Sequence, residues 1–176
     1  RLVSYDYDNM SRREKLIYPD NSYVTYQYDA LSRLDKIIDD SNNVIADYDY
    51  DSLGRRTLLT LGNDANAVYD YDLGNRLTKL TNNLDDTNSL TFAYDDYDKV
   101  GNRLSMRINN ANAHVYTYDE IYRLTSVDYN DGNATSYLYD ALSNWLETDD
   151  GTTLSFTSDN MNQYTYVGAT QYFYND

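Results

Sequence analysis

The stretch "VIADYDYDSLGRRTLL", from Val44 to Leu59, decides how this chain folds. Tyrosine and aspartate alternate through it, and arginine follows a few residues later. Such alternation is typical of a β-strand, because neighbouring residues of a strand point to opposite faces. The segment "DSLG" then favours a tight turn into "RRTLLTL". Related phrases, "SYDYDNMSRREKL" from Ser4 and "VYDYDLGNRLTKL" from Val68, indicate a repeated unit.

The dipeptide Tyr-Asp recurs at a nearly constant spacing, with steps of 21, 22, 21, 26, 21 and 21 residues. The copies are Tyr7-Asp8, Tyr28-Asp29, Tyr50-Asp51, Tyr71-Asp72, Tyr97-Asp98, Tyr118-Asp119 and Tyr139-Asp140. The long step contains "NNLDDTNS", from Asn82 to Ser89, which predicts a longer loop. A fixed period of this kind indicates a repeat architecture, in which each unit packs on its neighbours.

A base stands five residues after most of these tyrosines. The bases are Arg12, Arg33, Arg55, Arg76 and Arg123; in the fifth repeat the base is displaced by one position to Arg103, and in the seventh the position holds Asn144. The full phrase is therefore Tyr-Asp-x-x-x-Arg-Leu, with a degenerate copy at Ser158. We expect the aspartate to bond backbone N–H groups of the turn and the arginine to meet an aspartate carboxylate.

Each repeat is predicted to be a β-hairpin. Between Arg33 and Asp51, "RLDKII" and "VIADYDY" are the strands and "DDSNN" is the turn. Tyr48 and Tyr50 then share a face that one hairpin cannot bury. Stacked hairpins would form a continuous sheet, in which each tyrosine stacks on the tyrosine of the next repeat. The predicted fold is all-β: stacked β-hairpin repeats forming a spiralling sheet or solenoid, as part of a shell or a fibre.

Composition excludes several classes of function. The chain of 176 residues has no cysteine, one histidine (His114) and a net charge of −15. A thiolate metal site and a Ser-His-Asp triad are therefore not expected. Nucleic acid is not expected as a partner either, because binding to phosphates needs basic patches. No apolar run approaches the roughly 18 residues of a membrane span, so membrane insertion is not expected.

The repeated phrase resembles the YD-repeat, or Rhs (rearrangement hotspot), family, which includes bacterial wall-associated proteins, toxin-complex C components and animal teneurins. The resemblance covers the chain from about Tyr5 to Asp176. It implies hairpins that wind as a spiralling sheet, which closes into a hollow shell in large members, and an exported protein with a structural, adhesive or cargo-enclosing role. It also implies carbohydrate binding. Toxin-type members end in an Asp-Pro-rich self-cleaving segment; here the only proline is Pro19.

Both ends of the sequence fall within a repeat. Arg1-Leu2 matches the second half of a unit, and the final "YFYND" matches the first half of another. We therefore expect a single array, residues 1–176, of about seven to nine repeats of about 21 residues, truncated within a repeat at both ends. Its partners are expected to be adjoining repeats of a longer chain or copies of itself, which would pair through open sheet edges.

Three local features of the sequence suggest candidate sites. Asp128, Asn130 and Asp131 in "DYNDGN" offer oxygen ligands for calcium, but they lack the full EF-hand loop, and a hairpin turn is the alternative. No other cofactor is expected. Asn9 and Asn133 begin N-glycosylation sequons. Trp145, beside Asn144, is either locally repacked or part of a sugar-stacking surface.

The sequence therefore predicts a non-enzymatic, extracellular or cell-surface structural protein, the building block of a cell-surface or fibrous assembly. The alternative is the wall of a YD-repeat shell that encloses a secreted toxin or adhesin. A third interpretation is a carbohydrate-binding or carbohydrate-active module. With 26 aspartates, however, pairs of carboxylates arise by chance and do not by themselves indicate a glycosidase.

Overall fold

The computed structural model describes residues 2–85 and 87–174. These residues form 17 β-strands and no helix. The strands are β1 (Ser4–Tyr7), β2 (Arg13–Ile17), β3 (Tyr23–Tyr28), β4 (Leu34–Asp39), β5 (Val44–Tyr50), β6 (Arg56–Leu61), β7 (Asn66–Tyr71), β8 (Leu77–Asn83), β9 (Ser89–Tyr97), β10 (Arg103–Ile108), β11 (His114–Tyr118), β12 (Leu124–Asp128), β13 (Ala134–Tyr139), β14 (Trp145–Asp149), β15 (Thr153–Ser158), β16 (Tyr164–Val167) and β17 (Thr170–Gln171). The all-β fold predicted from the repeat is confirmed.

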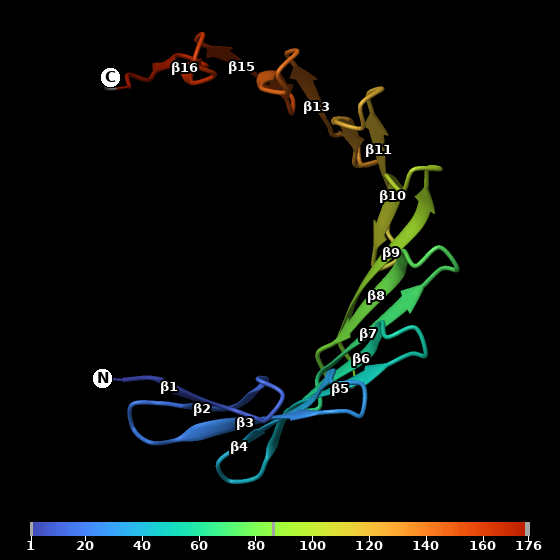
Figure 1. Ribbon diagram of the computed structural model, residues 1–176. Coiled ribbons are helices and arrows are strands. Elements are labelled where there is room, and N and C mark those ends of the chain that lie inside the picture. Colours follow the sequence, from blue (N-terminus) through green and yellow to red (C-terminus); the bar gives the residue numbers. More distant parts are fainter. Residues whose placement is uncertain (1, 86, 175–176) are drawn as a thin grey trace. The chain divides into compact units, whose positions relative to one another are not determined.

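Each strand lies antiparallel beside the next one along the chain (Figure 1). The hairpin predicted between Arg33 and Asp51 is strands β4 and β5, in which Ile37 pairs with Ala46. The predicted "DSLG" turn then leads from β5 into β6. The chain divides into two compact units, residues 1–92 and 93–176, and the border falls within β9.

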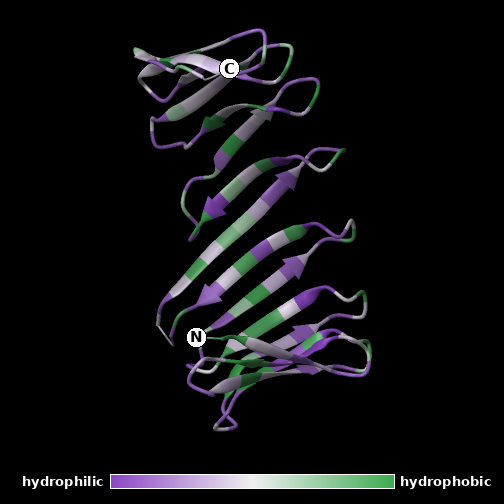
Figure 2. Cartoon of the chain, turned by 60° about the vertical axis from the view of Figure 1, so that its left-hand side comes forward, coloured by the Kyte–Doolittle hydropathy of each residue, from purple (hydrophilic) through white to green (hydrophobic). Residues whose placement is uncertain are grey.

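The sheet has a single layer, so little of it is buried. Of the described side chains, four are buried: Ala46, Ala67, Tyr116 and Val127. Ala46 pairs with Ile37 on one side and with Leu61 on the other, so the most protected positions lie between neighbouring strands. Polar and apolar residues alternate along the strands (Figure 2), but no second layer covers the apolar side chains among the described residues. Contacts between strands and between repeats must therefore supply most of the stability.

Most hairpin turns share one geometry. In the second repeat the N–H of Asp29 donates to the Arg33 carbonyl at 2.9 Å, and the N–H of Ser32 donates to the Asp29 carbonyl at 3.0 Å. Ser32 has a φ of 63°, in the left-handed region. This combination is the three-residue hairpin loop, a type I turn closed by a left-handed residue. Glycine and asparagine recur at that position because they adopt a positive φ at little cost, and serine and Tyr122 are held in the same conformation in other turns.

The polar stretch from Asn82 to Ser89 does not form the longer loop expected from the sequence. Asn82 and Asn83 end β8 and Ser89 begins β9, while the Leu84 N–H donates to the Asn88 carbonyl at 2.9 Å. The extra residues therefore lengthen the two strands and leave the turn short. Asp86 lies outside the described residues.

A β-bulge recurs at the repeat tyrosine, in the strand pair that joins one hairpin to the next. Asp49 pairs with Leu58, but Tyr50 pairs with Arg56, so Thr57 is the extra residue of β6. The same shift occurs at Tyr7, Tyr28, Tyr71, Tyr118, Tyr139 and Ser158. A bulge interrupts the ladder and leaves backbone groups without their regular partners. The bulge is not predicted by the sequence pattern.

Candidate functional site: the contacts that join one repeat to the next

The aspartate of each Tyr-Asp pair organises the turn that follows it. In the third repeat, Asp51 Oδ1 accepts the N–H of Leu53 and the N–H of Arg55, both at 2.9 Å. Asp51 Oδ2 accepts Arg55 Nε at 2.6 Å. One carboxylate thus holds two backbone donors of the turn and the side chain four residues on. The same arrangement recurs at Asp8, Asp29 and Asp119.

The arginine held in this way also reaches the next repeat. The Arg33 guanidinium carbon lies 4.4 Å from the centre of the Tyr50 ring, and its Nη1 donates to the Asp51 carbonyl at 3.3 Å. Arg33 thus contacts its own aspartate and the Tyr-Asp pair of the following repeat, and we call this set of contacts the clasp. Equivalent ring contacts join Arg12 to Tyr28, Arg55 to Tyr71 and Arg123 to Tyr139, at 4.3–4.6 Å.

The tyrosine returns a second contact to the preceding repeat. The Tyr50 hydroxyl donates to the Leu34 carbonyl at 2.8 Å. Leu34 is the residue that pairs with Tyr28 beside the bulge, so the hydroxyl bonds a carbonyl at the interrupted part of the ladder. The same bond runs from Tyr28 to Arg13, from Tyr71 to Arg56, from Tyr118 to Arg103 and from Tyr139 to Leu124.

These contacts differ from the tyrosine ladder expected from the sequence. Tyr28, Tyr50, Tyr71 and Tyr139 each lie under an arginine of the preceding repeat instead of stacking on its tyrosine. A guanidinium over an aromatic face is favourable because the ring quadrupole attracts the cation. The arginine also neutralises its own aspartate, so rows of carboxylates do not face one another unscreened.

Asparagine takes the position of arginine beside two of the turn aspartates. The assignment of Arg103 to this position in the fifth repeat is therefore wrong. Asn102, not Arg103, occupies the position beside Asp98: its backbone N donates to Asp98 Oδ1 at 2.8 Å and its Nδ2 donates to Oδ2 at 2.7 Å. Asn144 makes the same two bonds to Asp140, at 2.9 and 2.8 Å. Asparagine has an amide donor within reach of the carboxylate, so it keeps the bond to the aspartate with a shorter side chain.

Arg103 belongs instead to a second row of contacts. Its guanidinium carbon lies 4.6 Å from the centre of the Tyr116 ring and 5.4 Å from that of Tyr94. Arg56 lies in the same way between Tyr48 and Tyr69, and Arg13 between Tyr5 and Tyr26. Trp145 takes this position in the seventh repeat, where its ring packs on Tyr137 and Phe156 at centroid distances of 6.3 and 5.6 Å.

The turn carboxylates are held in their charged form. The pKa values of Asp8, Asp29 and Asp72 lie below the ordinary value, chiefly because the backbone N–H of the arginine four residues on donates to each carboxylate. At Asp140 the side-chain amide of Asn144 is the main cause of the lowered pKa. Hydrogen bonds to the ionised form lower a carboxyl pKa in this way.

The residues considered for calcium lie in a turn. Asp128 Oδ1 accepts the Asn130 N–H at 2.8 Å, and Asp131 Oδ1 accepts the Asn133 N–H at 2.9 Å. Across the part of the chain that the structure describes, no group of three or more acidic, histidine or cysteine side chains converges as metal ligands would. Calcium binding at Asp128, Asn130 and Asp131 stays a prediction.

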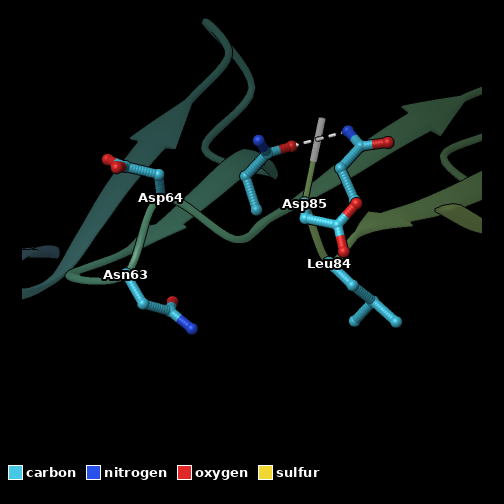
Figure 3. A pocket seen from close by; sticks show the side chains of 6 residues that line it. Asn63, Asp64, Leu84 and Asp85 are labelled. Atoms are coloured by element: carbon cyan, nitrogen blue, oxygen red, sulfur yellow. Dashed lines mark hydrogen bonds between the residues drawn. The ribbon is translucent and has the colours of Figure 1, made fainter. Parts of the chain in front are cut away.

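An acidic hollow of about 450 Å³ lies elsewhere, between the turns that follow β6 and β8. Asn63, Asp64, Leu84 and Asp85 line it, and Figure 3 shows the Asp64 and Asp85 carboxylates pointing away from each other. Asp85 is instead engaged in its own turn, where its Oδ2 accepts Asn88 Nδ2 at 2.7 Å, and this bond is the main cause of its strongly lowered pKa. The hollow does not assemble a set of ligands from these two carboxylates.

The remaining predicted positions lie on the surface. Asn9 and Asn133 are exposed in turns, so both sequons are accessible, and their glycosylation stays a prediction. Ser158 replaces tyrosine in the degenerate copy, yet Asp159 Oδ1 still accepts the N–H groups of Met161 and Gln163 at 2.8 and 3.0 Å. Arg1, Asn175 and Asp176, on which the two half-repeats partly rest, lie outside the described residues.

Comparison with known proteins gives a likeness of fold. No protein-family model matches the chain, and no curated protein matches it. Among solved structures, the chain is similar to TcdB2-TccC3 without its hypervariable C-terminal region, with a TM-score of 0.80 and 19% identity over 94% of this chain. It is also similar to the Photorhabdus luminescens Tc holotoxin pore with a mutated TccC3, with a TM-score of 0.77, 19% identity and the same coverage.

The chain spans about a tenth of the length of the structures that it matches. At this level of identity the comparison shows the fold, an antiparallel sheet of hairpin repeats that also occurs in Tc toxin components. It is consistent with the YD-repeat resemblance, which rests on the repeated phrase itself.

Replacing Tyr50 with phenylalanine tests the bond between repeats. Tyr50→Phe keeps the ring under Arg33 but removes the donor to the Leu34 carbonyl. We expect a loss of about 1 kcal/mol in the free energy of unfolding, the usual net value of one hydrogen bond, measured by urea denaturation. Tyr18→Phe, at a tyrosine that is 41% exposed and outside the repeat phrase, is the control and should cost much less. Equal effects of the two changes would contradict the assigned role.

The lowered aspartate pKa values predict a loss of stability in acid. A carboxyl whose folded-state pKa is depressed contributes fully above its unfolded pKa, near 4, and loses that contribution as pH falls through the folded-state value. We expect the melting temperature to fall steeply below about pH 4. Asp29→Asn should flatten this dependence, whereas Asp40→Asn, in an exposed turn, should leave it unchanged. Identical pH profiles for the two variants would refute the assignment.

Proposed function

We propose that this chain is a non-enzymatic structural segment, part of the wall of an extracellular protein shell that encloses a toxin or another exported cargo. The observation that carries the proposal is the clasp, in which an arginine bonds its own aspartate and covers the tyrosine of the following repeat, as Arg33 does with Asp29 and Tyr50. Such an array extends by repeating one contact. It can therefore cover a large surface without a buried core.

Two further observations support this role. The sheet of each unit is a single layer with few buried side chains, four among the described residues, as a thin wall requires. The fold is shared with Tc toxin components, and the family resemblance implies a shell in large members. The described part of the chain contains no helix that could cross a membrane. Adjoining repeats or copies of the chain are its proposed partners, and glycans are a further candidate.

Electron microscopy of the purified native protein that carries these repeats tests the proposal. Discrete hollow particles are expected. Regular filaments would contradict the shell and favour a fibre built from the same clasps. Extended single molecules that form neither would contradict both.

A matched pair of variants links the particles to the clasp. Tyr50→Leu with Tyr71→Leu removes two hydroxyl bonds and two arginine–ring contacts, and it should reduce the yield of intact particles. Tyr18→Leu should not, because Tyr18 is exposed and outside the clasp. Particles unaffected by the double substitution would show that the wall does not depend on these contacts.

A further inference from the structure

One exposed apolar side chain occupies nearly every Tyr-Asp turn, two residues after the aspartate. In the first unit these are Met10, Leu31 and Leu53, with Leu73 one position earlier in its turn; in the second they are Val100, Ile121, Leu142 and Met161. Apart from Leu73, these side chains are 59–74% exposed. The backbone N–H of Leu31 donates to Asp29 Oδ1 at 2.8 Å, and that of Leu53 to Asp51 Oδ1 at 2.9 Å. The side chain is thus carried by a turn that the clasp holds in place.

The turns at the opposite edge of the sheet provide a direct comparison. They close with the same backbone bonds, as between the Leu61 N–H and the Ala65 carbonyl at 2.8 Å. The position that holds leucine in the Tyr-Asp turns is polar there: Asp20, Ser41, Asn63 and Asp131. One edge of each unit is therefore apolar at a position where the other edge is polar, although turn geometry demands neither.

The charges of the two edges differ as well. Five Tyr-Asp turns contain an ion pair within the turn: Asp8–Arg12, Asp29–Arg33, Asp51–Arg55, Asp72–Arg76 and Asp119–Arg123. The turns of the opposite edge contain no lysine or arginine, and most of them, such as "DDSNN" and "YNDGN", contain carboxylates. In the first unit, where all four Tyr-Asp turns contain such an ion pair, two Tyr-Asp edges can approach with little electrostatic cost, whereas two opposite edges would repel each other.

The spacing selects the partner. Successive Tyr-Asp turns are two strands apart, which is roughly 9–10 Å at the usual strand spacing. A helix, whose two turns rise about 10.8 Å, falls out of step with this interval by about 1 Å at every repeat. A second row of the same turns matches it at every repeat, and two identical rows can pair about a two-fold axis.

We propose that the apolar row of Tyr-Asp turns is a docking surface for the same row on a second copy of this chain. The inference rests on the proposed wall role, since it supplies the lateral contact by which neighbouring strips of the wall would adhere. Each exposed side chain would then be covered, in the first unit at an edge whose turn aspartates are already paired with arginines.

Sedimentation equilibrium over a range of protein concentrations tests the proposal. The chain should dimerise, and Leu31→Ser with Leu53→Ser should weaken dimerisation by at least about tenfold, because two apolar side chains per copy leave the interface. Ser41→Asn with Asn63→Ser, at the matching positions of the opposite edge, should leave it unchanged. Circular dichroism checks that each variant is folded. A chain that stays monomeric, or leucine variants that dimerise like the control, would overturn the inference.

A cross-linking experiment identifies the edge without disturbing the leucines. The chain has no cysteine, so Ser52→Cys, next to Leu53, introduces a single thiol. This variant should form disulfide-linked dimers on mild oxidation, and Asn63→Cys should not. Preferential cross-linking through Asn63→Cys would overturn the inference. Intact hollow particles combined with a negative result here would refute the docking surface alone, whereas edge pairing without particles would refute the shell alone.

Discussion

A sheet of one layer cannot bury a core, and the rest of this structure follows from that constraint. Four described residues are buried, so the hydrophobic effect that stabilises most domains contributes little beyond the contacts between strands. Stability must come from bonds that each repeat makes with its neighbours. The clasp supplies them: Asp29 holds Arg33, Arg33 covers Tyr50, and Tyr50 bonds back to Leu34.

In the clasp, one arginine makes contacts both within its own repeat and with the next repeat. Its bond to the aspartate fixes the turn, and its position over the next tyrosine fixes the register of the following hairpin. Asn102 and Asn144 keep the first contact with a shorter side chain. In the seventh repeat Trp145 follows Asn144 and packs between Tyr137 and Phe156, so ring packing contributes there.

The hairpins could be predicted from the sequence because the period, the alternation and the turn residues all agree. The turn role of Asp51 and the aspartate contact of Arg55 could be predicted for the same reason. The bulge beside Tyr50 could not, since one skipped residue leaves no mark on the pattern. Because the bulge was not predicted, the bond from the Tyr50 hydroxyl to a backbone carbonyl was not predicted either. Stacking between tyrosines was expected at the Tyr50 ring, over which the Arg33 guanidinium lies. Arg103 was misassigned because Asn102 was not recognised as a substitute.

A double-mutant cycle between Arg33 and Tyr50 tests the central claim most directly. Arg33→Asn should keep the bond to Asp29, as Asn102 does with Asp98, and remove only the contact with the next repeat. We predict that Tyr50→Leu costs about 1 kcal/mol less in the Arg33→Asn background than in the natural chain, measured by urea denaturation. Costs that add to within about 0.3 kcal/mol would show that the two residues do not interact and would contradict the clasp.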